Sequence, residues 1–180
     1  MKIVTLMLFS LGLFAACKQE EKKVEDPGAI SLRAEGKKLD LPYPLTRIPD
    51  WEMGDDNNVP IAMNVIKCYE AKDFVSISNY LADTVIFSSA VGDFRGSKKE
   101  AVKFLKDLRA KRLEVTIEMN DYESVKSKSR NEEWVSLWYT ETITDRTGNV
   151  DSAQVMDDYK IVKGKVALVD SKIRRMGAKQ

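Results

Sequence analysis

One carboxylate interrupts a row of apolar side chains late in the chain. In the predicted strand 150–161, Asp157 shares one face with Val155 and Tyr159. A buried carboxylate is costly unless it finds hydrogen-bond donors or is held neutral. Asp157 is therefore the candidate polar anchor of a pocket wall, and also the candidate acid–base group of any catalysis. The competing interpretations are an acid at the rim of the domain, or a register in which Asp158 points inward instead.

Four aromatic side chains with polar groups are candidates to line a cavity around that carboxylate. Tyr69 lies in a predicted helix, and Trp134, Trp138 and Tyr159 lie in predicted strands. Phenol and indole groups donate hydrogen bonds and orient ligands in apolar pockets. Packing in the core accounts for the same residues equally well. The sequence thus predicts a ligand-binding set of five residues: Tyr69, Trp134, Trp138, Asp157 and Tyr159.

The composition excludes several kinds of chemistry. The chain has 180 residues and no histidine, which removes the commonest general base and the commonest metal ligand. Its two cysteines are too few for a four-thiolate zinc site, and no histidine is available to activate Cys68. With 29 basic and 28 acidic residues, the net charge of +1 does not favour nucleic acid as a partner. We expect no metal and no cofactor.

The first residues resemble the signal peptide of a bacterial lipoprotein. Met1-Lys2 is followed by an apolar run, 3–16, which is too short to span a bilayer and ends in two alanines before Cys17. The resemblance implies a signal peptide over 1–16, cleavage after Ala16 and acyl chains on Cys17, which anchor the protein to the membrane. The competing interpretation is an ordinary secretory signal followed by a chance cysteine.

The residues after Cys17 point to the outer membrane. The stretch 18–21, Lys-Gln-Glu-Glu, resembles the short acidic motif of surface-exported lipoproteins of Bacteroidetes. We therefore expect an outer-membrane lipoprotein, on either the periplasmic or the cell-surface side. Residues 17–45 are charged and interrupted by proline and glycine, a composition typical of a tether. A single domain then occupies 46–180.

The spacing of apolar residues in that domain predicts helices followed by strands. An apolar stripe at Ala62, Val65, Ile66 and Tyr69 indicates a first helix, and a short second helix follows Asp73. A strand over 84–87 comes next. Ser97 and Glu100 then form a capping box that opens a third helix. Alternation predicts the remaining strands, 113–120, 134–139, 150–161 and 165–173, which we expect to be antiparallel. Helices segregated from antiparallel strands make an α+β domain.

Residues 58–176 resemble the nuclear transport factor 2-like superfamily, which includes SnoaL-like cyclases and ketosteroid isomerase. The residues that carry the resemblance are 69–73, 81–85, Gly96 with 100–102, and 164–166. The resemblance implies a cone, in which a curved antiparallel sheet wraps around helices and leaves a pocket open at one end. It also implies a homodimer formed through the convex side of the sheet.

The same resemblance speaks against isomerase chemistry. The general-base aspartate of ketosteroid isomerase would fall within 86–88, where this chain has no acid. The tyrosine of that enzyme would fall near Val65, and only its hydrogen-bond-donating aspartate has a counterpart, near Asp157. Dehydratases of this fold that use histidine are excluded as well.

Three functions are thus consistent with the sequence. The favoured hypothesis is a membrane-anchored lipoprotein whose pocket binds a small apolar ligand, or a partner, without catalysis. The second is a SnoaL-like isomerase, cyclase or hydrolase that uses Asp157 as its acid–base group. The third is a structural or partner-binding module with a filled core. A cavity beside Asp157 would separate the first two hypotheses from the third.

Overall fold

The computed structural model describes residues 41–47, 49–90 and 92–175, and the described residues from Leu45 onward form one compact unit. The predicted signal peptide 1–16, the predicted lipidation site Cys17 and the tether up to residue 40 lie outside the described residues. Within the described part, no helix has the length and apolar character needed to cross a membrane.

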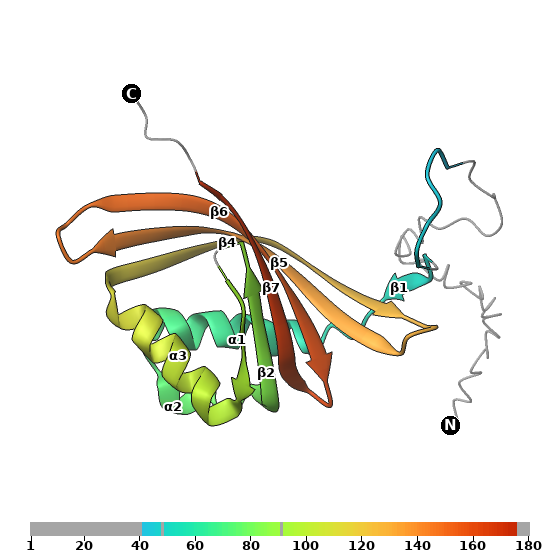
Figure 1. Ribbon diagram of the computed structural model, residues 1–180, viewed down its shortest axis with the longest axis horizontal. Coiled ribbons are helices and arrows are strands. Elements are labelled where there is room, and N and C mark those ends of the chain that lie inside the picture. Colours follow the sequence, from blue (N-terminus) through green and yellow to red (C-terminus); the bar gives the residue numbers. More distant parts are fainter. Residues whose placement is uncertain (1–40, 48, 91, 176–180) are drawn as a thin grey trace, which may run out of the picture. The chain divides into compact units, whose positions relative to one another are not determined.

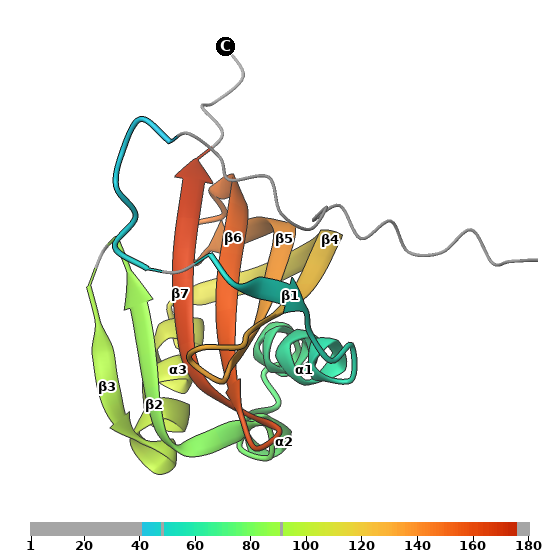
Figure 2. The ribbon, with the colours of Figure 1, turned by 90° about the vertical axis from the view of Figure 1, so that its right-hand side faces the viewer.

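The described residues form a single seven-stranded sheet in the order β1-β4-β5-β6-β7-β2-β3. Figure 1 shows its long central strands, and Figure 2 shows β2 and β3 on one side with β4 on the opposite side. Strand β1 pairs with β4 and completes that edge. The strands are β1 (Trp51–Met53), β2 (Leu81–Ser89), β3 (Phe94–Ser97), β4 (Arg112–Ser127), β5 (Glu132–Asp145), β6 (Val150–Val162) and β7 (Lys165–Arg175).

The sheet is mixed, which differs from the fully antiparallel arrangement that we expected. Successive strands β4 to β7 pair antiparallel, but β2 pairs with β7 in parallel, with Phe87 opposite Val169. Parallel neighbours need a long connection between them. Here β3, α3 (Lys98–Ala110) and β4 to β6 supply that connection.

Helices α1 (Asn58–Ala71), α2 (Phe74–Ile77) and α3 lie on one side of the sheet (Figure 2). The predicted capping box begins α3: the Ser97 hydroxyl accepts from the Glu100 amide at 3.4 Å, and the Glu100 carboxylate accepts from the Ser97 amide at 2.8 Å. The predicted stripe of α1 is also present, with Ala62, Val65 and Ile66 buried. Their burial holds α1 against the sheet.

Alternation along β5 and β6 decides which residues face the helices. Val135, Leu137 and Tyr139 of β5 are buried, whereas the residues between them are only partly buried. On β6, Asp157 and Tyr159 are buried in the same way. We call the buried side the inner face and the other side the outer face. The α+β class is confirmed, and Asp157 lies on the inner face.

Candidate functional site

A cavity of about 490 Å³ lies beside the inner face of the sheet. Its volume falls within the roughly 300–1,000 Å³ typical of pockets for small molecules. Most of its lining is apolar or aromatic. Helices α1 and α3 contribute Val65, Ile66, Phe104, Leu105 and Leu108, and the sheet contributes Val155 among others.

Asp157 is a buried carboxylate in the lining of this cavity, with 5% of its surface exposed. Its Oδ2 accepts two hydrogen bonds, from Tyr139 Oη at 2.7 Å and from Tyr159 Oη at 3.1 Å. Its Oδ1 is buried and has no hydrogen-bond partner among the described residues. Ser171 stands opposite Asp157 in the pairing of β6 with β7. Both hydrogen bonds from the tyrosines therefore reach the same oxygen of the carboxylate.

Burial is the main influence on the pKa of Asp157 and raises it above its ordinary value. The nearby hydroxyls of Ser171, Tyr139 and Tyr159 oppose this and lower the pKa as donors, although Ser171 does not form a hydrogen bond of ordinary geometry with Oδ1. Burial and the Asp157 carboxylate raise the pKa of both tyrosines well above 10. Both phenols therefore keep their protons and remain donors.

A second polar group of the cavity is the ion pair between Arg112 and Glu141. Arg112 Nη1 lies 2.7 Å from Glu141 Oε1, and both residues line the cavity. Burial raises the pKa of the Glu141 carboxyl, and the Arg112 charge acts against that rise. The Arg112 guanidinium lies 5.8 Å from the centre of the Tyr69 ring. The hydroxyl of Tyr69 is buried without a hydrogen-bond partner within the described ranges.

Arg109 lies beside this pair and is almost completely buried, with 3% of its surface exposed. Its Nη1 donates to the Arg112 carbonyl at 2.8 Å, and its Nη2 donates to the Glu70 carbonyl at 3.4 Å. In the part of the chain that the structure describes, Arg109 forms no ion pair at hydrogen-bonding distance with a carboxylate. The Glu70 carboxylate is bound by Lys67 and by the Ile117 amide.

The structure brings three of the five predicted ligand-binding residues to the cavity. Tyr69, Asp157 and Tyr159 line it. Trp134 and Trp138 do not, because they alternate on β5 with the buried residues of the inner face. Trp134 instead donates to Glu132 at 3.3 Å on the outer face. The expectation that these two tryptophans line the pocket is therefore wrong.

The alternative register, with Asp158 pointing inward, is not the one adopted. The Asp158 carboxylate accepts from the Ser136 hydroxyl at 2.5 Å and pairs with the Lys172 ammonium at 2.7 Å. Both partners lie on the outer face, because Ser136 alternates with the buried Val135 and Leu137, and Lys172 alternates with the cavity-lining Ser171 and Ile173. The side chains of Asp157 and Asp158 therefore lie on opposite faces of β6.

Sequence reasoning missed Tyr139, Arg112 and Glu141. Two of them had only half a signal: Tyr139 and Glu141 follow Leu137 at intervals of two along β5 and so share its face, but alternation alone does not say which face of β5 is buried. Arg112 had no such signal. It begins β4 directly after α3, and it stands opposite Asp145 in the register with β5, so its ion pair with Glu141 is evident only from the side-chain positions.

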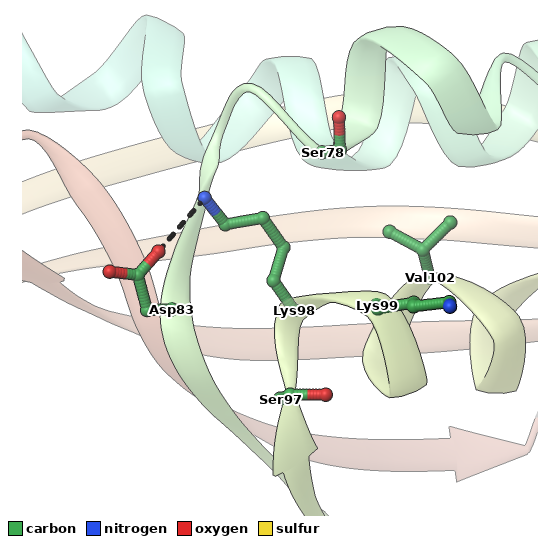
Figure 3. A pocket seen from close by; sticks show the side chains of 6 residues that line it. All are labelled: Ser78, Asp83, Ser97, Lys98, Lys99 and Val102. Atoms are coloured by element: carbon green, nitrogen blue, oxygen red, sulfur yellow. Dashed lines mark ion pairs between the residues drawn. The ribbon is translucent and has the colours of Figure 1, made fainter.

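A second, shallower hollow of about 450 Å³ lies on the surface near the start of α3 (Figure 3). Its basic residues do not converge on one point: Lys98 pairs with Asp83 at 3.2 Å, and Lys99 points in another direction. The Ser97 hydroxyl is already bonded to Glu100. Among the described residues, no group of three side chains from His, Cys, Asp and Glu is placed to hold a metal ion. The inner cavity is therefore the candidate site.

No family model matches the sequence, and no curated protein matches it. Solved structures do match the fold. An M. tuberculosis LEH-like epoxide hydrolase matches with a TM-score of 0.55 at 10% identity, over 66% of this chain and 83% of that one. An NTF2-like protein of unknown function from Burkholderia pseudomallei matches with a TM-score of 0.55 at 12% identity, over 66% of this chain and 91% of that one. AusH from Aspergillus nidulans matches with a TM-score of 0.53 at 13% identity, over 68% and 87%. At such identities the likeness concerns the fold alone, and it confirms the predicted fold.

Proposed function

We propose that this nuclear transport factor 2-like domain binds a small, mostly apolar molecule in its inner cavity, as the pocket domain of a lipoprotein. The observation that carries the proposal is the state of Asp157. Its carboxylate lines an apolar cavity of about 490 Å³, two phenols hold one of its oxygens, and the other oxygen has no partner among the described residues.

A buried polar group that lacks a hydrogen-bond partner destabilises the protein unless a bound molecule supplies one. A buried acceptor or donor without a partner costs roughly 1–3 kcal/mol. The cavity has two such groups within the described residues, Asp157 Oδ1 and the Tyr69 hydroxyl. A ligand with a polar group on an apolar body would recover part of that free energy while it fills the cavity. A filled core, the third of the hypotheses, is disfavoured by the size of the cavity.

We place this domain at the outer membrane, on the periplasmic or cell-surface side, with acyl chains on Cys17 as its anchor. The apolar run 3–16 and the two alanines before Cys17 support this placement. If it is correct, a radioactive fatty acid will label the wild-type protein and will not label Cys17→Ala. Wild-type protein without label would contradict the anchor. A homodimer through the outer face of the sheet belongs to the same proposal.

The binding test uses the full-length chain and N-phenyl-1-naphthylamine, a neutral fluorophore that brightens in apolar surroundings. Val155 lines the cavity, and its neighbour Met156 lies on the outer face. We expect saturable binding to the wild type, a loss of about tenfold or more in affinity for Val155→Phe, and little change for Met156→Phe. Thermal unfolding would verify that both variants are folded. No saturable binding, or equal affinity in both variants, would contradict the proposal.

A second candidate function, an enzyme of the isomerase, cyclase or hydrolase type, is favoured by Glu141. This acid lines the same cavity as Asp157, and burial raises the pKa of both. Two acids with raised pKa values in one cavity are the kind of pair that can exchange protons with a bound substrate. Native mass spectrometry of protein from its own organism separates the two functions. A co-purifying molecule that stays unchanged during incubation supports binding, and its conversion to a product of different mass supports the enzyme.

A further inference from the structure

The polar groups of the cavity form two clusters of different character. In the first, Asp157 is surrounded by the uncharged hydroxyls of Tyr139 and Tyr159. The second consists of Arg112 and Glu141, with Arg109 directly beside them, and we call it the arginine corner. The first cluster contains a negative group without a cation, whereas the second contains more cations than anions. The two clusters should therefore favour different parts of a ligand.

Arg112 has donors to spare at this corner. A guanidinium carries five N–H donors in a planar fork. In the described residues, the Arg112 side chain uses one nitrogen, Nη1, in its bond to Glu141. The Arg112 side chain is 22% exposed and that of Glu141 12%, so both remain within reach of a molecule in the cavity. A planar acceptor such as a carboxylate fits the remaining donors.

The charges at the corner leave an excess of one positive charge. Arg112 and Arg109 contribute two guanidinium groups, and Glu141 contributes one carboxylate. The hydrogen bonds of Arg109 go to carbonyls, which do not cancel its charge. The Glu70 carboxylate also feels the charge of Arg109, but it pairs with Lys67 at 2.7 Å, so that pair adds no net charge to the count. A single anionic group entering the corner would balance the remaining charge in surroundings of low dielectric constant.

The acids that line the cavity would repel a bound anion if they were ionised. The surroundings of each acid limit or define that repulsion. Asp93 accepts from the Ser88 hydroxyl at 2.7 Å and is exposed to solvent, which screens its charge. Asp157 is separated from water, and burial favours its neutral form. Glu141 is the direct competitor, because it occupies the donor of Arg112 that points toward it. A bound anion would have to share Arg112 with Glu141, or displace it.

We infer that the ligand of the cavity is an apolar carboxylic acid whose carboxylate binds Arg112, and that Glu141 limits its affinity by competing for the same guanidinium. This inference rests on the proposed function, because it names the class of molecule that fills the cavity. The body of the acid lies against the apolar side chains of α1 and α3. A ligand ammonium would meet the excess positive charge of the corner. A neutral amide would bind Arg112 and Glu141 together, and it is the alternative that the test must distinguish.

The test compares acids and amides of the same shape on the full-length chain by calorimetry: 2-naphthoate with 2-naphthamide, and decanoate with decanamide. We expect the wild type to bind at least one acid more tightly than its amide. Glu141→Gln, which keeps the shape and removes the competing charge, should strengthen binding of that acid by about tenfold. Arg112→Gln should weaken it by about tenfold or more and change the affinity for the amide far less.

Two further variants serve as controls for stability and for nonspecific charge effects. Arg112→Gln leaves Glu141 without its cation and can lower stability, so the double variant Arg112→Gln/Glu141→Gln removes both charges together. It should bind acid and amide with similar affinity. Lys172→Gln removes a cation from the outer face and should leave the affinity for the acid unchanged. Amides that bind as tightly as the acids, or weaker acid binding in Glu141→Gln, would overturn the inference while the proposed function stands. If the wild type binds neither acids nor amides but still binds N-phenyl-1-naphthylamine, only the inference is overturned. If it binds none of these probes, the proposed function is overturned as well.

Discussion

Asp157 and Asp158 are consecutive residues of β6, yet their surroundings have almost nothing in common. Asp158 faces outward and is bound by a hydroxyl and by the ammonium of Lys172. Asp157 faces inward and is bound by two phenols, with one oxygen left without a partner among the described residues. The aspartate on the outer face therefore has a cationic partner, whereas the aspartate on the inner face has an oxygen without a hydrogen-bond partner among the described residues.

The difference shows which face is arranged for a ligand. Ion pairs on the outer face are exposed to water, which screens them, so each contributes little to stability. Groups on the inner face are separated from water, where a missing hydrogen bond has its full cost and persists only where the structure or a function maintains it. A cavity lined by incomplete polar groups is therefore less stable than it would be with an apolar lining. Such sites are where binding is expected.

The largest effect expected from this contrast is that of Tyr139→Phe, which removes the shorter of the two hydrogen bonds to Asp157. We expect the free energy of unfolding at pH 7 to fall by about 1–3 kcal/mol, since a buried carboxylate loses a donor. The loss should shrink toward pH 3, where Asp157 is protonated in the folded and the unfolded states alike. Urea unfolding at both pH values measures it.

A matched control for this variant is Tyr122→Phe, because Tyr122 is an exposed tyrosine of β4. Its effect should stay within about 0.5 kcal/mol. If Tyr139→Phe is as mild as Tyr122→Phe, the phenol does not support the carboxylate, and the contrast between the two faces is wrong.

An intermediate effect of opposite sign is expected for Asp157→Asn. Because the pKa of Asp157 is higher in the folded than in the unfolded protein, ionisation destabilises the fold. That cost is absent below the unfolded value of about 3.9, grows as the pH rises toward the folded value, and is complete above it. The variant removes the charge. It should therefore gain stability on the order of 1 kcal/mol at pH 7 and no advantage near pH 3.

Asp158→Asn provides the comparison on the outer face. It loses the attraction of Lys172 and should be slightly less stable than the wild type at pH 7. Urea midpoints of both variants at pH 7 and pH 3 separate the cases. A loss of stability for Asp157→Asn at pH 7 would mean that its carboxylate is well paired in solution, and the incomplete state of the inner face would be disproved.

Much of the fold could be predicted because its signals are local. The capping box of Ser97 and Glu100 and the stripe of α1 depend on residues a few positions apart. Alternation along β6 placed Asp157 inward for the same reason. The parallel pairing of β2 with β7 has no local signal, because it joins segments about 80 residues apart, such as Phe87 and Val169.

Site residues could be predicted on strands where only one face is apolar, and they were missed on strands where both faces are apolar. Strand β5 is apolar on both faces around Trp134 and Trp138, so alternation alone could not assign the inner side. Arg112 and Glu141 meet across β4 and β5, whose register shifts twice along the pair. Such irregularities change which residues are neighbours, and no spacing in the sequence reveals them.

The smallest effect is expected for Lys172→Gln on the outer face. Burial lowers the pKa of the Lys172 ammonium, but its hydrogen bonds to Asp158 and Asp170 outweigh this and raise the pKa. The Lys172 side chain is 49% exposed, so water and salt screen both ion pairs. We expect a loss below about 0.5 kcal/mol at low salt and none in 1 M sodium chloride.

The loss in Tyr139→Phe should persist in that salt, because ions do not screen a buried hydrogen bond. Urea unfolding of both variants at the two salt concentrations makes the comparison. A salt-sensitive loss for Tyr139→Phe, or a large and salt-resistant one for Lys172→Gln, would show that the two faces of β6 do not differ in the way their contacts indicate.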